Sequence, residues 1–396
     1  MLPAEGSTAS ALPSVALTRR GAARWRGGHP WIFRDDIEPV DLPNGEIVRA
    51  LAAGGDPLGT AFYGSVSKIA LRRLGGPERE PGPDFLAARL DAAIAWRETI
   101  AAGTGALRLV SSDADGIPGL IVERYGEHLV VQALVAGVDR RLEAVAAHLD
   151  ARLRPRSILA RNDVNARALE GLPLEVRDLR GQAPARVEVE DGELRMVVDL
   201  REGQKTGGYL DQRENRAAAA EYLRGRVLDA FCYDGGFALH AARRAETVLA
   251  VDASAPALER GAEAASRSGV SNVVFERANV FDFLQSADKA RRRFDGIVLD
   301  PPAFVKSRKD LAAGVRAYKE INLRAMRCLE AGGVLVTCSC SYNLREDGFM
   351  EVLAGAAADA RRRVVVVEKR SQARDHPVLL GLPESHYLKC LILKVD

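Results

Sequence analysis

The second half of the chain alternates apolar strands with helices, and this alternation constrains the fold more than any other feature. From about residue 190, four almost continuously apolar segments are separated by segments of helical pattern: RVLDAFC, TVLAVDA, FDGIVLDPP and GGVLVTCSCS. Strands of this kind are typical of a parallel sheet that helices cover on both faces. We therefore predict an α/β, Rossmann-like domain over residues 191–396, with ligands bound beyond the carboxyl ends of its strands.

Two smaller regions precede this domain. Residues 15–82 contain short strand-like pieces divided by Gly, Pro and Asn turns, which predicts a small β-barrel. Residues 83–190 alternate amphipathic helices with strands and predict a small α+β module. Residues 1–14 are expected to form a disordered tail.

Composition excludes several classes of protein. The five cysteines include no repeated CxxC, which argues against a disulfide framework and against a structural zinc site, so no metal is expected. No run approaches eighteen apolar residues, so we expect no membrane association and a reducing, cytoplasmic location. The net charge of +2 does not by itself indicate a nucleic-acid partner, which must be argued from local patches.

The first βα turn of the α/β region, DAFCYDGGF, is the expected cofactor site. It lacks the G-x-G-x-x-G pattern of a pyrophosphate cradle, although Gly235 and Gly236 allow close backbone approach. Acidic residues such as Asp234 suit a cofactor with an ammonium and a sulfonium, and Asp252 ends the next strand, where ribose hydroxyls bind. S-adenosylmethionine (SAM) is therefore the leading cofactor. The alternative is a glycine turn that only begins a helix.

The segment LDPPAF ends a further strand. Its two prolines stop the ladder, and Asp300 and Phe304 then offer a hydrogen-bond acceptor and an aromatic face, as a flipped-out base requires. The alternative is a proline-rich strand exit without a ligand.

The segment TCSCSYN follows the last apolar strand, and its cysteines are candidates for covalent catalysis. Carbon 5 of a pyrimidine accepts a methyl group readily only after a thiolate has added at carbon 6, whereas an exocyclic nitrogen needs no cysteine. Cys338 and Cys340 therefore favour carbon as the acceptor. A thiolate also requires a lowered thiol pKa or a neighbouring base. The other three cysteines are expected to be buried and inert.

The N-terminal segment is locally basic and aromatic. Arginine binds phosphates and stacks on bases, so we predict an RNA-contacting face. Its members are Arg19, Arg20, Arg24, Arg26 and Arg34, with Trp25 and Trp31. The alternative is a solvated basic face over buried tryptophans.

Taken together, the motifs resemble one family. They are RRGAARWRGGHPWIF, DADGIPGLIVERYG, GGYLDQRENR, DAFCYDGGFALHAA, VDAS, DPPAFVKS, YKEINL, TCSCS and DHPVLLGLPESHYLK. In order and spacing they resemble the large-subunit ribosomal RNA cytosine-C5 methyltransferase I family. The resemblance implies an N-terminal PUA RNA-binding domain, a small α+β domain and a class I SAM-dependent methyltransferase domain. It implies a cytosine in 23S ribosomal RNA as the substrate; a homodimer and a monomer both stay open.

The resemblance also implies roles for single residues. Asp252 would bind the SAM ribose, and Phe231, Gly235 and Gly236 would line the cofactor. Asp300 and Pro302 would face the target base. Because an adjacent carboxylate would raise the pKa of a thiol, we expect Asp300 itself not to be the base of the thiol but to be protonated or hydrogen-bonded at the N3 edge of the cytosine. Cys340 matches the nucleophile, and Cys338, where the family often has an aromatic residue, would support it or only pack.

Further positions depart from the family pattern or have two interpretations. Asp234 stands where Thr is usual, and Asn279 where Asp is usual; Asn279 would accept from the adenine amino group through its carbonyl. Asp211 is expected to be a helix N-cap, while Gln212 and Arg213 would contact cofactor or RNA. His376 is either catalytic or a packed loop residue.

Two alternatives to cytosine-C5 methylation remain open at this point. One is a SAM-dependent enzyme that methylates a nitrogen of an RNA base. The other is a non-catalytic RNA-binding protein that retains the fold.

Overall fold

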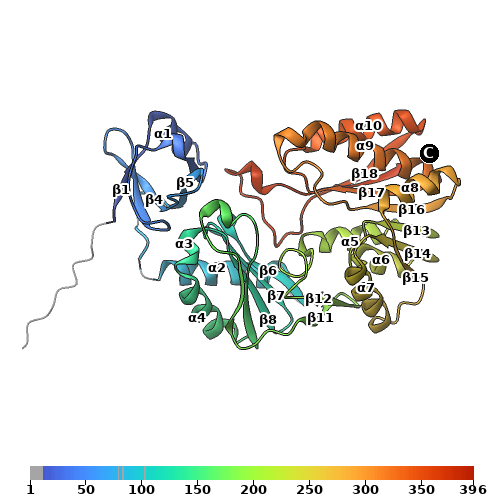
Figure 1. Cartoon of the computed structure of the whole chain (residues 1–396), viewed down its shortest axis with the longest axis horizontal. Helices are drawn as coiled ribbons and strands as arrows, with labels where there is room; N and C mark the ends of the chain where they lie inside the picture. The colour runs from blue at the N-terminus through green and yellow to red at the C-terminus, as the bar shows by residue number, and fades with distance from the viewer. Residues whose placement is uncertain (1–11, 79, 83, 102–103) are drawn as a thin grey trace, which may run out of the picture. The chain divides into compact units, whose positions relative to one another are not determined.

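The computed structural model describes residues 12–78, 80–82, 84–101 and 104–396 (Figure 1). Most of the expected N-terminal tail lies outside these residues. The chain forms two compact units. One comprises the described residues up to 99 together with 108–183 and 379–382, and the other comprises 100–107, 184–378 and 383–396.

The N-terminal domain is a five-stranded sheet of order β1-β3-β4-β5-β2, in which β1 and β3 are parallel and the other pairs are antiparallel. Its elements are β1 (Ser14–Ala16), α1 (Arg19–Arg26), β2 (Trp31–Phe33), η1 (Arg34–Asp36), β3 (Ile47–Leu51), β4 (Pro57–Tyr63) and β5 (Ile69–Gly75). The three strands expected from the sequence in this region are confirmed.

Helix α1 was not expected, and it carries four of the predicted RNA-contacting arginines. Thr18 caps it: the Thr18 hydroxyl accepts from the Gly21 N–H at 3.1 Å. Only Gly21, Ala22 and Trp25 of the helix are buried. The segment contains four arginines and one large apolar residue, so its composition was interpreted as a basic face and the helical spacing of its buried residues was missed.

The central module is a sheet of order β10-β9-β8-β7-β6 with helices. Its elements are α2 (Phe85–Ile100), β6 (Ala106–Ser111), η2 (Ser112–Asp115), β7 (Leu120–Tyr125), β8 (His128–Ala133), α3 (Ala136–Asp139), α4 (Leu142–Leu153), β9 (Ser157–Asn162), η3 (Ala168–Glu170) and β10 (Glu175–Arg180). Strands β7 and β8 pair in antiparallel fashion around the predicted turn.

The C-terminal domain is a seven-stranded sheet of order β15-β14-β13-β16-β17-β19-β18, preceded by the hairpin β11 (Arg186–Asp191) and β12 (Leu194–Asp199). Its strands are β13 (Arg226–Ala230), β14 (Thr247–Asp252), β15 (Val273–Arg277), β16 (Phe294–Leu299), β17 (Leu329–Ser339), β18 (Val364–Arg370) and β19 (Lys389–Val395). The first five are parallel to one another, and only β19 runs antiparallel to its neighbours. The predicted Rossmann-like α/β fold is confirmed.

Helices cover both faces of this sheet (Figure 1). Their bounds are η4 (Leu210–Gln212), α5 (Arg213–Ala220), α6 (Gly236–Ala242), α7 (Ala255–Arg267), α8 (Val280–Lys289), η5 (Arg308–Asp310), α9 (Leu311–Cys328), α10 (Glu346–Ala360) and η6 (Pro383–Ser385). One buried core joins the sheet to α8, α9 and α10, and a second joins it to α6 and α7. The carboxyl ends of β13, β14, β16 and β17 therefore meet at one edge, where the loops are free to form a site.

Candidate active site

A cavity of about 600 Å³ opens at the carboxyl ends of the parallel strands. Eleven of the residues singled out in the sequence line it: Asp211, Gln212, Phe231, Asp234, Gly236, Asp252, Asn279, Asp300, Pro302, Phe304 and Cys340. Lining residues that the sequence reasoning missed include Lys205, Tyr209, Arg216, Tyr233 and Phe281. The position of the strands' carboxyl ends thus predicted the cavity. It did not identify Lys205, Tyr209 and Arg216, which come from outside the βα turns, and the role of Tyr233 within the first turn was not recognised.

The turn after β13 is held in an uncommon backbone conformation. Phe231 and Tyr233 have positive φ angles of 66° and 51°, and Gly235 follows with φ 77°. Asp252 fixes this turn, because one carboxylate oxygen accepts from the Tyr233 N–H at 3.0 Å and the other from the Ser254 N–H at 2.9 Å. Gly235 does not line the cavity; it lies where a Cβ would be 2.7 Å from the ring of Phe275. Glycine is therefore required at position 235 both by the close packing against Phe275 and by the positive φ angle.

Asn279 caps helix α8. Its Oδ1 accepts from the N–H groups of Phe281 at 2.9 Å and Asp282 at 3.3 Å. Because the side-chain oxygen of Asn279 already accepts these two bonds, Asn279 would interact with a ligand mainly by donating from its amide N–H groups. This differs from the expectation that its carbonyl would accept from an adenine amino group.

Two buried aspartates lie under the cofactor turn. Burial raises the pKa of Asp229, at the end of β13, to about 8. Burial also raises the pKa of Asp234, and the guanidinium groups of Arg216 and Arg260 oppose that rise. Arg216 lies near both carboxyls and is the principal cation on this side of the cavity.

Asp300 follows β16 and is held by a relay of amides. Gln212 Nε2 donates to Asp300 Oδ1 at 2.9 Å, and Asn215 Nδ2 donates to Gln212 Oε1 at 2.6 Å. Burial and the nearby charge of Asp211 raise the pKa of Asp300 to about 6, against the effect of Arg216 and of the Gln212 hydrogen bond. Near neutral pH both the protonated and the ionised form of Asp300 are therefore populated.

Cys340 lies one residue beyond the end of β17 and faces the cavity. Its Sγ is 3.9 Å from the Pro301 carbonyl oxygen. Burial, followed by the charge of Asp300, raises the pKa of the Cys340 thiol to about 11, while Lys205 and Lys389 oppose this. Of the two expected routes to a thiolate, a lowered thiol pKa or a neighbouring base, this environment does not supply the first, because desolvation outweighs the nearby cations.

Cys338 does not reach the cavity. It is fully buried in the core and lies directly opposite Cys390 in the β17–β19 pair. The strand ends at Ser339, so the alternation that would place both thiols on one side does not extend to Cys340. Of the two roles considered for Cys338, the geometry favours packing.

Aromatic side chains form one wall of the cavity. The ring of Phe304 packs against Phe231, Phe281 and Tyr318, with centroid distances of 6.2, 5.7 and 4.7 Å. The contact with Phe231 is T-shaped, which is a preferred arrangement of aromatic pairs, and the other two are tilted. They place a continuous apolar surface beside Asp300 and Cys340.

Asp211 is not a helix N-cap, contrary to the expectation. Its carboxylate pairs with Lys205 and accepts from the Tyr387 hydroxyl at 2.8 Å. Lys205 also lies 4.6 Å from the centroid of the Tyr209 ring. These contacts join the segment from Lys205 to Asp211 with Tyr387, which is 176 residues away from Asp211, and local sequence could not reveal that pairing.

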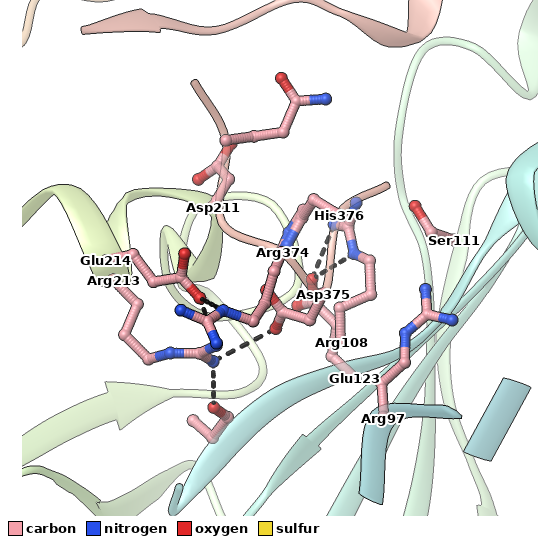
Figure 2. A network of polar contacts seen from close by, with 12 residues as sticks. Arg97, Arg108, Ser111, Glu123, Asp211, Arg213, Glu214, Arg374, Asp375 and His376 are labelled. Carbon is pink, nitrogen blue, oxygen red and sulfur yellow. Dashed lines mark hydrogen bonds and ion pairs between the residues drawn. The ribbon is translucent and has the colours of Figure 1, made fainter. Parts of the chain in front are cut away.

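Arg213 and His376 are not among the residues that line the cavity, and both belong to a network of polar contacts (Figure 2). Arg213 Nη1 donates to the Ala106 carbonyl at 2.9 Å and pairs with Asp375 at 3.2 Å. His376 is buried with Nδ1 3.0 Å from Asp375 Oδ1, and Arg374 pairs with Glu214. Their contacts fit a structural role, and His376 fits the packed-loop interpretation.

The N-terminal arginines fall into two groups. Arg19 and Arg26 are exposed. Arg20 and Arg24 both pair with the buried carboxylate of Asp36, and Arg24 lies 4.8 Å from the centroid of Phe33.

The remaining members of this segment are engaged within the protein. Trp25 is buried and donates to the Leu58 carbonyl at 2.8 Å, so it does not offer a face to a base. Trp31 donates to Asp113 at 2.9 Å. Arg34 donates to the Ser67 carbonyl at 3.0 Å.

Within the described ranges, no cluster of three or more His, Cys, Asp or Glu side chains has the arrangement of a metal site. Among the helices of that part of the chain, none is long and apolar enough to cross a membrane.

Comparison with known proteins identifies the family. The model of the S-adenosylmethionine-dependent methyltransferases matches residues 131–381, and the model of the PUA-like domain matches residues 15–75. The ribosomal RNA large subunit methyltransferase I of Shewanella denitrificans is 38% identical over 378 residues, which cover 93% of this chain and 95% of the relative. The chain belongs to the ribosomal RNA large subunit methyltransferase I family.

Further comparisons agree with this assignment. The family member from Photobacterium profundum is 37% identical over 387 residues, covering 95% of this chain and 98% of the relative. The crystal structure of SMU.776 complexed with SAH has a TM-score of 0.84 at 18% identity and covers 97% of this chain and 100% of that one. At that identity the likeness establishes the fold alone.

SAM is the cofactor, and the residues of the cavity fit it. The Asp252 oxygens retain lone pairs that can accept from ribose hydroxyls, since each takes one backbone N–H. Asp234 and Phe281 both line the cavity; Asp234 would offer a carboxyl to the ammonium group, and Phe281 would offer an apolar surface to the adenine. Bound there, SAM supplies an electrophilic methyl group.

Proposed function

We propose that this protein methylates carbon 5 of a cytosine in large-subunit ribosomal RNA, with Cys340 as the nucleophile. The substrate follows from the names of its relatives, which are ribosomal RNA large subunit methyltransferases I. The observation that carries the chemistry is the placement of Cys340 and Asp300 on one cavity, at the ends of the adjacent parallel strands β17 and β16.

In the proposed reaction the Cys340 thiolate adds to carbon 6 of the cytosine. This makes carbon 5 nucleophilic, and carbon 5 then takes the methyl group. A base removes the carbon-5 proton, and the thiolate leaves from carbon 6 as the ring double bond re-forms. The protein thus replaces one difficult substitution with addition, transfer and elimination.

Asp300 acts on the opposite edge of the base in this proposal. A protonated carboxyl donates to the cytosine N3 and stabilises the negative charge that develops when sulfur adds. The raised pKa of Asp300, about 6, supports this role because it keeps a fraction of the carboxyl protonated near neutral pH. Phe304, packed behind Asp300, offers the ring for stacking.

A substrate RNA with 5-fluorocytosine at the target position tests the covalent step. Fluorine at carbon 5 cannot leave as a proton does, so wild type should form an adduct that survives denaturing electrophoresis. Cys338→Ala should trap equally well, and Cys340→Ala should not trap. Near wild-type methylation of ordinary RNA by Cys340→Ala would overturn the assignment.

One observation favours a second candidate, methylation of an exocyclic nitrogen. The Cys340 thiol has a pKa of about 11, so little of it is thiolate near neutral pH. Asp300 and the Pro301 carbonyl could instead accept from an amino group. This alternative predicts an N-methylated nucleoside in digested product RNA and full activity of Cys340→Ala, so mass spectrometry separates the two.

We further propose that the exposed arginines of α1 contact the RNA. Arg19 and Arg26 are exposed. Arg20 and Arg24 are paired with Asp36, although the Arg20 side chain is 68% exposed. Reversing Arg19 and Arg26 to Glu should weaken RNA binding and reduce the slope of log affinity against log salt by up to about two. SAM affinity should not change. Arg363→Glu serves as a control on an exposed arginine elsewhere. An unchanged slope would argue against this face.

Whether the protein is a homodimer stays a prediction.

A further inference from the structure

Lys389 is a buried lysine next to the proposed nucleophile, and the family motifs gave it no role. It is the first residue of β19 and is 3% exposed. Its partner across the antiparallel pair is Ser339, the last residue of β17. A buried ammonium is costly unless it is hydrogen-bonded or near a negative charge, so its presence here requires an explanation.

The Lys389 ammonium is tied to the backbone on both sides of the site. Nζ donates to the Ser341 carbonyl at 2.7 Å and to the Tyr387 carbonyl at 2.9 Å. Ser341 is the residue after Cys340, so Lys389 fixes the turn from which the thiol projects. Two carbonyl oxygens leave one of the three N–H donors of the ammonium uncommitted by these bonds.

The same turn is held from the other side by the hydroxyl of Ser341. This oxygen accepts from the Val305 N–H at 3.0 Å and lies 2.9 Å from the Tyr318 hydroxyl. Cys340 is therefore fixed between β19 and the segment that follows the Asp300 motif. Because both groups are held in place, the positive charge of Lys389 stays close to the Cys340 sulfur and favours its thiolate form.

We propose that Lys389 is a positioning residue for Cys340: it fixes the turn that carries the thiol and supplies the positive charge that stabilises the thiolate. The inference rests on the proposed function for its role in catalysis. The proton that leaves sulfur passes to water in the cavity, and the ammonium stays protonated. The thiolate and the ammonium then form a pair of opposite charges in a partly desolvated site, where such a pair is stronger than in water.

The charges around the thiol agree with this role. The groups that act on Cys340 or respond to it are Asp300, Asp211, Lys205, Lys389, Tyr209 and Tyr318, and Glu346 acts on Lys389. Asp300 and Asp211 raise the pKa of the thiol, and both lysines lower it. Burial lowers the pKa of Lys389 to about 8, while Cys340 acts in the opposite direction. Formation of the thiolate should thus hold Lys389 in its charged state.

The titration of Cys340 tests this proposal without any RNA. Cys340 is the one cysteine of the five that is not buried, so alkylation by iodoacetamide can be followed at that residue by mass spectrometry. The rate is measured from pH 6.5 to 10. Below about pH 8 the charged Lys389 should favour the thiolate, and above that pH, where Lys389 loses its charge, the difference from a neutral variant should narrow. Altered access would instead change the rate equally at every pH. We expect Lys389→Met to raise the thiol pKa by about one unit, which makes alkylation at a fixed lower pH about tenfold slower.

Three variants separate charge from structure. Lys389→Arg keeps the charge and should retain a profile near that of wild type. Lys389→Gln keeps donors to the carbonyls but not the charge, and it should behave like Lys389→Met; it replaces that variant if Lys389→Met does not fold. Lys394→Met, on the same strand but with a half-exposed side chain, should leave the profile unchanged.

The outcomes distinguish this inference from the proposed function. An unchanged thiol pKa in folded Lys389→Gln, with SAM affinity like that of wild type, would overturn the role of Lys389 whatever Cys340 does to RNA. A raised thiol pKa together with full methylation by Cys340→Ala would support the electrostatic pairing and overturn only the nucleophile assignment.

Discussion

Gln212 Nε2 donates a hydrogen bond of 2.9 Å to Asp300 Oδ1, across 88 residues of sequence. The bond joins the loop before α5 to the end of β16. Asn215 orients the Gln212 amide by donating to its carbonyl oxygen, so Gln212 presents its N–H groups to the carboxyl. The protonation state of Asp300 therefore depends on a residue outside the strand that carries it.

Replacing Gln212 should change the pH dependence of methylation. The hydrogen bond favours the ionised carboxylate, so Gln212→Leu should raise the pKa of Asp300 above about 6. If protonated Asp300 is the active form, activity falls as pH rises through this pKa, and the variant should move that limb to higher pH. Single-turnover rates between pH 5.5 and 9 check this. Gln204→Leu, on the same cavity, is the control. A limb that moves to lower pH would contradict the assignment.

Asp252 should set the affinity for SAM. Asp252→Ala removes the acceptors for ribose hydroxyls and frees the Tyr233 and Ser254 N–H groups that the carboxylate holds. Loss of charge-assisted bonds of this kind costs about 1.5–3 kcal/mol, or roughly ten- to a hundredfold in affinity. Calorimetric titration measures the change. Glu276→Ala, an exposed acid at the neighbouring strand β15, should bind like wild type, and equal affinities of both variants would disprove the role.

Gly235 should be far more sensitive to substitution than another glycine of similar backbone conformation. Both Gly235 and Gly269 have positive φ, 77° and 67°, so alanine strains either backbone by about 1–2 kcal/mol. Only at Gly235 would the new Cβ meet a neighbour, 2.7 Å from Phe275, whereas Gly269 has no atom within 4 Å. Steric overlap should add about 1–3 kcal/mol. Urea unfolding compares the variants, and equal losses would show that Phe275 moves aside freely.

Asp229 should make the protein less stable as pH rises. Its pKa is raised to about 8 in the folded state, from an ordinary value near 4, because it is buried. One oxygen accepts from the Ala238 N–H at 2.8 Å, and within the described residues no hydrogen bond reaches the other. Between about pH 4 and pH 8 the folded state therefore binds more protons than the unfolded state, and the free energy of unfolding declines as pH rises.

Asp229→Asn should remove this contribution to the pH dependence. We expect the variant to be more stable than wild type at pH 8.5, by roughly 1–3 kcal/mol, and to differ little at pH 5. Urea unfolding at pH 5, 7 and 8.5 measures the difference. A difference that is the same at every pH would show that Asp229 does not titrate in this range.

The sequence by itself determined the α/β domain and the place of its site. Asp252, Asp300 and Cys340 could be assigned to one cavity because each follows an apolar strand, and parallel strands end at one edge of a sheet. These positions could be predicted from the neighbouring residues alone, without knowing which distant residues they contact. Helix α1 was missed because the segment was interpreted from its arginines and tryptophans, and only three of its residues are buried.

Tertiary structure alone decided the environment of those residues. The contacts of Gln212 with Asp300 and of Lys389 with Ser341 span 88 and 48 residues, and such pairings depend on how the strands and loops pack. It also decided that Cys338 is buried opposite Cys390 while Cys340 faces the cavity, since β17 ends between them. The protonation of Asp300 and Cys340 follows from burial and from charges brought together by the fold, and neither is encoded in the residues next to them.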